Sequence, residues 1–278
     1  MQEGNYTKMV HGKYQVIDTH CHVYPDHIAE KAKNATDTYF DMHSVHTGEL
    51  SDLFKVMDES GVDHCVICYC ATKPEFVKMT NDQVAMDVKI GNGRLTGLGS
   101  MQQFSEDQRE TVRYIKSLGF HGVKLHPDMQ RFVLDSPKGM EMLSAVNEAG
   151  LPVLLHTGDK RFDFSNPDRV IHVAQEFPNM TIIGGHFAGW SLWLEASRKL
   201  HEIPNLYVDC SSSSFGLTDS EYRECIELYG TDRVLFGTDY PMWDAADEIE
   251  RLLSLGFSES DYTKIFSENA KKVFNLDI

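Results

Sequence analysis

Residues 16–22 read Val-Ile-Asp-Thr-His-Cys-His, an apolar start followed by two histidines. Side chains two positions apart on a β-strand point to the same face of the sheet. If this stretch is a strand, His20 and His22 project together from its C-terminal end. Two imidazoles held on one face by a stiff backbone form half of a divalent metal site. A pair of histidines at a surface turn, without a metal, is the alternative that this stretch leaves open.

Seven further apolar, β-branched runs follow the first, and stretches with helical periodicity separate them. The predicted strands cover residues 16–22, 64–70, 95–101, 122–126, 152–156, 180–186, 206–210 and 233–239. Alternating strands and helices predict a parallel sheet, and eight such units predict an α/β fold of the closed (β/α)8 TIM-barrel type. An open doubly wound sheet is the second choice. Its dinucleotide-binding version is disfavoured because no Gly-x-Gly-x-x-Gly follows a strand.

The chain of 278 residues has a length that suits one barrel. No low-complexity segment or shift in composition marks a second domain, so residues 1–278 are predicted to form a single domain. The segment 23–50 is long for a connection between a strand and a helix. It is predicted to form a long loop or a small cap over the site.

Composition excludes several classes of partner. The net charge of −16 argues against nucleic acid and anionic membranes as partners. It says nothing about the substrate in the pocket, which is expected to be a small molecule. No apolar run is long enough to span a membrane, and the first residues lack the apolar core of a signal peptide. Cys65 and Cys68 have the spacing of a redox pair, but on a strand they face opposite ways and are expected to be buried. A reducing cytoplasm is the expected location.

Polar residues stand where several predicted strands end. In a barrel of this type, the active site lies at the C-terminal ends of the strands. The residues at these ends are His20, His22, Lys124, His126, His156, His186 and Asp239. Core packing does not account for so many imidazoles and charges at one mouth, because buried polar groups need partners. A metal ion supplies such a partner.

Five motifs together resemble the amidohydrolase superfamily. They are Ile-Asp-Thr-His-Cys-His at 17–22, Gly-Val-Lys-Leu-His-Pro at 122–127, Pro-Val-Leu-Leu-His-Thr-Gly at 152–158, Gly-Gly-His-Phe-Ala-Gly-Trp at 184–190 and Phe-Gly-Thr-Asp-Tyr-Pro at 236–241. The pattern is most similar to the amidohydrolase-related branch, which also contains aminocarboxymuconate-semialdehyde decarboxylase and pyrone-dicarboxylate hydrolase. The resemblance extends over residues 14–275, and a homodimer is expected from it.

The resemblance implies a role for each residue of the predicted site. His20, His22, His156 and Asp239 are the implied metal ligands. Asp239 is also an implied proton shuttle, and His186 is the implied general acid/base or donor to a developing oxyanion. Three neutral imidazoles and one carboxylate suit Zn²⁺ with a further position for water, so zinc is the expected metal. Manganese is the alternative, because this ligand set does not select strongly among divalent ions.

Lys124 has three possible roles. In superfamily members with two metals, the corresponding lysine is carbamylated and bridges the ions, and His156 and His186 would then bind the second metal. In members with one metal, a cation at this position holds a substrate carboxylate, which is the favoured interpretation. A structural lysine paired with Asp239 or Asp209 is the third. His126 is expected to contact the metal ligands rather than the metal itself.

Several residues of the loops after the strands are weaker candidates for substrate contact. Arg131, Lys160 and Arg161 carry charges that suit an anionic substrate group, and Trp190 and Trp243 suit a pocket wall. Surface charge and packing, respectively, are the alternatives. Of this group, Arg131 and Trp190 are predicted to bind substrate.

The predicted activity is that of a metal-dependent hydrolase. Metal-bound hydroxide would attack an amide, ester or lactone-type carbonyl of a small molecule. The alternative is a metal-dependent, non-oxidative decarboxylase of a small carboxylic acid, because the same ligands serve that reaction. A non-catalytic metal-binding protein is the third hypothesis, and the presence of both His186 and Asp239 disfavours it.

Overall fold

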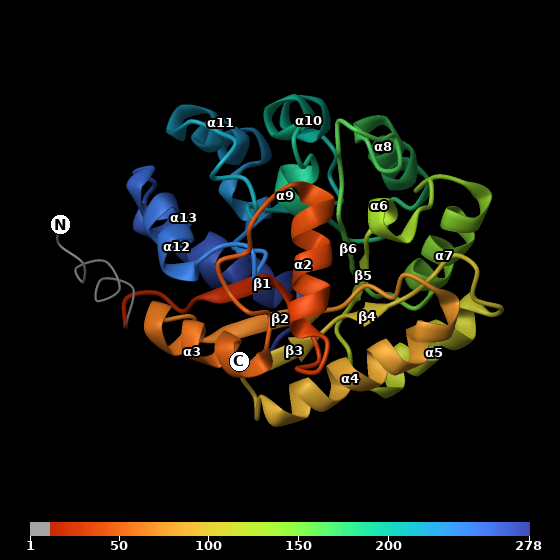
Figure 1. The fold of residues 1–278 in the computed structure, drawn as a ribbon. Helices are drawn as coiled ribbons and strands as arrows, with labels where there is room; N and C mark the ends of the chain where they lie inside the picture. The colour runs from red at the N-terminus through yellow and green to blue at the C-terminus, as the bar shows by residue number, and fades with distance from the viewer. Residues whose placement is uncertain (1–11) are drawn as a thin grey trace.

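A computed structural model describes residues 12–278 of the chain (Figure 1). Its strands pair in the orders β1-β2-β3 and β4-β5-β6-β7-β8-β9, and every pair is parallel. The strands are β1 (Ile17–His22), β2 (His64–Cys68), β3 (Leu95–Gly97), β4 (Gly99–Ser100), β5 (Val123–Leu125), β6 (Val153–Leu155), β7 (Ile182–Gly184), β8 (Leu206–Asp209) and β9 (Val234–Leu235).

Hydrogen bonds between the two sets of strands complete the ring. The run predicted as the third strand is divided into β3 and β4 at Leu98, whose N–H donates to the Ile67 carbonyl at 3.0 Å. On the opposite side, the Thr19 N–H donates to the Phe236 carbonyl at 2.9 Å, which joins β1 to the segment after β9. The predicted (β/α)8 barrel is therefore confirmed, with the third strand in two pieces.

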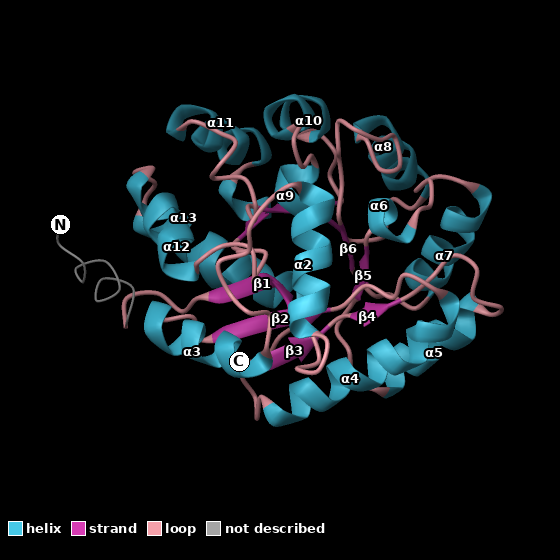
Figure 2. Cartoon of the chain, viewed as in Figure 1, coloured by secondary structure: helices cyan, strands magenta, loops and turns pink. Residues whose placement is uncertain are grey.

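Most of the helices surround the strands on the outside, whereas α2 lies in front of them (Figure 2). In chain order, the helices are α2 (Ala29–Phe40), α3 (Leu50–Ser60), α4 (Val77–Ile90), α5 (Gln108–Ser117), α6 (Pro127–Gln130), α7 (Pro137–Glu148), α8 (Pro167–Glu176), α9 (Gly185–Ala188), α10 (Trp193–Leu200), α11 (Asp219–Tyr229), α12 (Ala245–Ser254), α13 (Glu259–Thr263) and α14 (Asn269–Phe274), with short 3₁₀ or π turns η1 (Pro74–Phe76), η2 (Thr231–Arg233) and η3 (Lys264–Glu268). Among residues 12–278, no helix is long and apolar enough to cross a membrane.

Local sequence sets the ends of these helices. Thr218 forms a capping box with Glu221 at the start of α11, and Ser136 caps α7, which begins at Pro137. Gly61 ends α3 with φ of 78°, a left-handed conformation that glycine adopts at little cost.

The barrel interior is apolar at its N-terminal end and polar at its C-terminal end. Lys124 is the register partner of Leu154, which in turn pairs with Ile183, so all three side chains point into the barrel. The two apolar residues belong to a buried cluster that Phe274 of α14 contacts. Lys124 is fully buried, and its ammonium contacts His20 at the C-terminal end of β1. Close packing of the lower layers leaves the upper, polar end free for chemistry.

The segment 23–50 contains a helix, α2, which lies in front of the strands at the barrel mouth (Figure 1). The sequence predicted a long loop or small cap here without a defined helix. Just two residues of α2, Ala29 and Asp37, are buried, and no side chain caps its first turn. A helix with so little apolar face has a weak sequence signature. That the whole chain forms one domain stays a prediction.

The buried Glu248 of α12 makes the unfolding free energy of the protein depend on pH. Ser214 donates to its Oε1 at 2.5 Å, and burial raises the pKa of Glu248 to about 7. The folded state therefore binds this proton more tightly than the unfolded chain does. The resulting stabilisation is complete below about pH 4 and is lost as the pH rises through about 7.

We expect Glu248→Gln to flatten this pH dependence, because glutamine keeps the shape and does not ionise. Between pH 5 and pH 8, the wild type should lose on the order of 3 kcal/mol more unfolding free energy than the variant. Urea unfolding at several pH values measures this difference. Parallel pH curves for the two proteins would contradict the assignment.

Candidate active site

Three of the four predicted metal ligands converge at the barrel mouth. Asp239 Oδ1 lies 3.2 Å from His22 Nε2 and 3.5 Å from His20 Nε2. His20 and His22 come from the end of β1, and Asp239 follows β9. Parallel strands whose C-terminal ends meet at one edge bring these distant residues together. The three atoms lie close enough together for one metal ion to contact all of them.

Asp239 is held as a carboxylate. Burial opposes its ionisation, but the imidazoles of His20 and His22 outweigh burial and hold the pKa of Asp239 well below its usual range. Ser212 donates to its other oxygen, Oδ2, at 2.6 Å, and Trp243 Nε1 donates to Ser212 at 2.8 Å. Trp243 thus supports Asp239 through this serine, where the sequence suggested a pocket wall.

The backbone around the site is strained. Asp239 has φ of 64°, Ser212 has 44°, and His186, Phe187 and Ala188 have 60°, 53° and 58°. Residues other than glycine rarely adopt these values, and each costs on the order of 1–3 kcal/mol. Such residues cluster at functional sites, where the surrounding fold holds them in place.

His20 is oriented by a buried carboxylate. Its Nδ1 lies 2.9 Å from Asp209 Oδ2, so Nδ1–H donates and Nε2 presents its lone pair to the site. Burial first, and then the charge of Lys124, lower the pKa of His20 to about 4, so the imidazole is neutral. A neutral imidazole with a fixed tautomer is the form that binds a metal ion.

Lys124 donates to His20 Nε2 at 2.7 Å. Within residues 12–278, its ammonium has no carboxylate within ion-pair distance, so it is paired with neither Asp239 nor Asp209. Lys124 is fully buried and is not among the residues that line the cavity described below. The structure therefore places it against a candidate metal ligand. Its predicted role in substrate binding or bridging stays a prediction.

His156, the fourth predicted ligand, pairs with His186. The Ser211 carbonyl accepts from His186 Nδ1 at 3.0 Å, so His186 Nε2 must accept from His156 Nδ1–H, also at 3.0 Å. Burial lowers the pKa of both histidines, which agrees with neutral rings. His156 Nε2 is left buried, with no hydrogen-bond partner among the described residues, and faces Asp128 Oδ2 at 3.9 Å.

His126 stacks on His156, with ring centroids 3.9 Å apart and planes 10° apart. The sequence placed His126 behind the site, but its side chain reaches the cavity wall beside His156. The N–H of Met129 donates to its Nδ1, which follows from the turn of α6 at Pro127. This turn points the His126 ring across the mouth of the barrel. The alternation of side chains along a strand does not predict this orientation.

A cavity of about 400 Å³ opens onto these groups. The candidate site forms its floor, and α2 and α4 form much of its wall. Residues lining the floor and inner wall are His22, His126, His156, Trp190, Ser212 and Asp239. Trp190 therefore lies where a substrate contact was predicted. Arg131 does not, because it is exposed at the end of α6 and is absent from the cavity lining.

Arg161 fastens the cap. Its guanidinium pairs with the buried Asp159 at 2.7 Å and donates to the Tyr39 carbonyl, in the last turn of α2, at 2.6 Å. It also lies within 5.5 Å of the ring centroids of Phe40 and Trp190. A cation that binds the carboxyl-terminal turn of a helix stabilises it. With its donors engaged in this way, Arg161 holds α2 over the cavity.

Asp209, Ser211 and Ser212 contribute to the site, although the sequence assigned the serines no role and named Asp209 only as a possible partner of Lys124. Asp209 ends β8, and the two serines follow directly. The available signal was their position, since the C-terminal end of every barrel strand faces the site. A run of four serines after a strand is also typical of an ordinary loop. The sequence therefore did not single these residues out.

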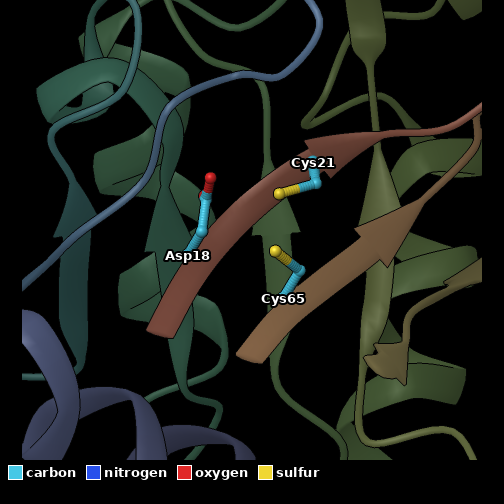
Figure 3. Close-up of side chains that lie close together, drawn as sticks. All are labelled: Asp18, Cys21 and Cys65. Carbon is cyan, nitrogen blue, oxygen red and sulfur yellow. The ribbon is translucent and has the colours of Figure 1, made fainter. Parts of the chain in front are cut away.

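A second buried cluster contains Asp18, Cys21 and Cys65 (Figure 3). Asp18 accepts from the N–H groups of His20 and Thr238, both at 3.0 Å, so it clamps β1 to the segment after β9. Burial raises the pKa of both thiols, which keeps them protonated and poor metal ligands. Cys65 and Cys68 are both buried and free, which agrees with the packing role expected from the sequence.

The donors present fit a divalent metal ion. Two imidazole nitrogens and one carboxylate oxygen converge, and Asp209 fixes the tautomer of His20 from behind. Imidazole and carboxylate together accommodate Zn²⁺ and Mn²⁺ without a strong preference. His20, His22 and Asp239 are the residues that would hold the ion.

Comparison with known proteins identifies relatives that cover nearly the whole chain. Gamma-resorcylate decarboxylase from Rhodococcus jostii is 22% identical in an alignment that covers 91% of this chain and 96% of that protein. An uncharacterized TIM-barrel protein from Bordetella bronchiseptica has a similar fold, with a TM-score of 0.78, 20% identity and coverage of 94% and 98%. A dihydroxybenzoic acid decarboxylase from Polaromonas sp. JS666, solved with manganese and 2-nitroresorcinol, has a TM-score of 0.72, 17% identity and coverage of 95% and 98%.

These relatives correct the predicted activity. The prediction of a hydrolase is wrong, because the relatives with an assigned activity are decarboxylases. The sequence could not separate the two reactions, since the same metal ligands serve both. A divalent metal is supported, and the metal in the Polaromonas enzyme is manganese, so zinc is not confirmed.

A family model also matches nearly the whole chain. A model described as amidohydrolase matches residues 17–276, which begin at β1 and end after α14. The match includes all five motifs from which the resemblance was inferred, together with the strand ends that carry the candidate ligands. The chain therefore belongs to the amidohydrolase family.

Proposed function

We propose that this protein is a metal-dependent, non-oxidative decarboxylase of a small aromatic acid that carries one carboxylate. The observation that carries the proposal is the convergence of His20, His22 and Asp239 at the barrel mouth, where His22 and Asp239 line a cavity of about 400 Å³. The decarboxylases among the relatives cover the same length of chain and supply the reaction class.

The cavity wall supports the choice of substrate. Tyr24, Phe40, Tyr69 and Trp190 provide aromatic surface that suits a planar ring. Among residues 12–278, no lysine or arginine lines the cavity. A second carboxylate on the substrate would therefore be buried without a partner, which costs several kcal/mol. The wall favours a monocarboxylate, whose single charge faces the metal site.

When bound, the metal ion would supply positive charge that holds the substrate carboxylate at the site. Loss of CO₂ from an aromatic acid requires a proton on the carbon that bears the carboxylate. The C–C bond then breaks, its electron pair restores the aromatic ring, and the net reaction replaces –CO₂⁻ and H⁺ by –H and CO₂.

Asp239 is the residue placed to carry that proton. It lines the cavity, whereas His186 lies behind His156 and does not. The pKa of Asp239 lies well below its usual range, so the carboxylate must first take up the proton that the reaction consumes, from solvent in the cavity, before it passes that proton to the ring carbon. Ser212 holds its second oxygen and fixes the direction of transfer. His186 acts as a positioning residue for His156.

The test uses purified protein loaded with Mn²⁺ and a panel of hydroxybenzoates that includes 2,6-dihydroxybenzoate. We expect CO₂ and the matching phenol in equal amounts, and no product after removal of metal with a chelator. Acids with a second carboxylate, such as 5-carboxyvanillate, should show about 10²-fold lower kcat/KM because of the unpaired charge. If the metal-loaded protein turns over no monocarboxylate of the panel, the proposal fails.

A further inference from the structure

The cavity is larger than a single-ring acid requires. Its volume is about 400 Å³, whereas a cavity of about 150 Å³ is enough to bind benzene in another protein. Pockets of about 300–1,000 Å³ are typical of drug-sized ligands. A ring whose carboxylate lies at the floor, beside His22 and Asp239, therefore leaves part of the cavity for a further group of the substrate.

The inner face of α2, which lies in front of the barrel mouth (Figure 1), forms one wall of this remaining space. Its residues that line the cavity have the spacing of one helix face and, with Ile28 just before the helix, are Ala32, Ala35, Thr36 and Phe40. Small side chains occupy the middle of this face and large ones its two ends, so a narrow chain can lie along the helix. The buried residues of α2 are Ala29 and Asp37, neither of which lines the cavity, so the rest of the protein does not cover this face.

Four methionines line the cavity as well. Met42, Met79, Met129 and Met242 come from separate segments, namely the loop after α2, helices α4 and α6, and the loop after β9. Methionine is unbranched and flexible, so it adapts to apolar ligands of irregular shape. A wall that combines these side chains with the small residues of α2 suits a flexible hydrocarbon chain.

The charges of the lining lie at the floor. Within residues 12–278, Asp239 is the one acidic residue of the lining, and no lysine or arginine joins it. Thr80 and Gln83, which line the cavity beside Met79, are polar but neutral. A charged substituent would lose its hydration at this wall without gaining a partner, whereas an apolar substituent gains free energy from burial.

We propose that the substrate is a hydroxybenzoate with an uncharged hydrocarbon chain para to its carboxylate. The para carbon is the ring atom farthest from the carboxylate, so its substituent points away from the floor and along the wall that α2 and α4 form. The inference rests on the proposed decarboxylation, because that reaction places the carboxylate at the floor. The inner face of α2 and the four methionines then determine substrate specificity.

Binding of the expected products tests the chain without requiring turnover. Decarboxylation of 4-methyl- and 4-pentyl-2,6-dihydroxybenzoate would give 5-methylresorcinol and 5-pentylresorcinol, which differ by four methylenes. A fully buried methylene raises affinity by about fourfold, so we expect the pentyl compound to bind about 10²-fold more tightly in isothermal titration calorimetry of Mn²⁺-loaded protein. A chain of the same length that ends in a carboxylate should lose this gain. A difference of less than about tenfold between the methyl and pentyl compounds would overturn the proposal.

Turnover separates this inference from the proposed function. The value of kcat/KM for 4-alkyl-2,6-dihydroxybenzoates should rise with chain length in parallel with product affinity. The rise should come mainly from KM, because the chain is remote from the reacting carbon. Tight binding of 5-pentylresorcinol without decarboxylation of any acid would contradict the reaction but keep the binding site for the chain. Decarboxylation that does not depend on chain length would keep the reaction and overturn the chain site.

The variant Ala32→Phe tests the part played by α2. Phenylalanine would occupy the space assigned to the chain, so we expect the Kd ratio of 5-methylresorcinol to 5-pentylresorcinol to fall from about 10² to below about ten. Asn34→Phe is the matched control, because Asn34 is exposed on the same helix and does not line the cavity. The ratio should remain that of the wild type in this control, and circular dichroism checks the fold of both variants. An unchanged ratio in Ala32→Phe would overturn the placement of the chain along α2.

Discussion

Replacing Asp239 by Asn is expected to lower kcat for decarboxylation by about 10²–10⁴-fold. Asparagine has nearly the same shape and still accepts the hydrogen bond that Ser212 donates to Oδ2 at 2.6 Å. It carries no charge toward His20 and His22, and it cannot take up or release the proton that the ring carbon requires. The loss should therefore fall on kcat more than on KM.

Asp244→Asn is the matched control for this prediction. Asp244 lies on the same segment, caps α12 through its side chain and does not line the cavity. Asparagine is as good an N-cap as aspartate, so stability and kcat should remain near those of the wild type. Measurement of both kcat and bound Mn²⁺ separates a lost proton carrier from a lost ligand. An Asp239→Asn protein with wild-type turnover would remove Asp239 from the reaction.

Asp209→Asn is expected to weaken Mn²⁺ binding by about 10- to 100-fold, although Asp209 is not itself among the proposed ligands. The carboxylate accepts from His20 Nδ1 at 2.9 Å and from the His186 N–H at 3.0 Å. In the variant, the asparagine NH2 group would face His20, so a hydrogen-bond donor would replace the carboxylate oxygen that accepts from Nδ1. His20 would then move its proton to Nε2 and lose the lone pair that faces the metal.

Titration of metal-free protein with Mn²⁺ measures this effect without reference to turnover. Asp219→Asn is a suitable control, because Asp219 is 74% exposed at the start of α11 and remote from the site. The variant should bind Mn²⁺ as the wild type does. Unchanged Mn²⁺ affinity in Asp209→Asn would show that the orientation of His20 does not depend on this carboxylate.

Much of the barrel was predictable because strand signals are local. The apolar runs at 64–70 and 152–156 are buried at each position of β2 and β6, as expected for strands covered on both faces. His20 and His22 share a face because of their spacing alone. The cap helix α2 was not predictable in this way, since its position over the mouth depends on Arg161 and on aromatic contacts far along the chain.

The amino-acid sequence by itself determined the order of strands, the C-terminal edge at which the site lies, and the residue types gathered there. These follow from side-chain periodicity and from the rule that parallel strands end at one edge. The tertiary structure decided which partner each imidazole has. His156 faces His186, His20 faces Asp209, and Asp239 closes on His22 from a segment more than two hundred residues away. Such pairings depend on strand register, side-chain rotation and burial, which arise only when the barrel closes.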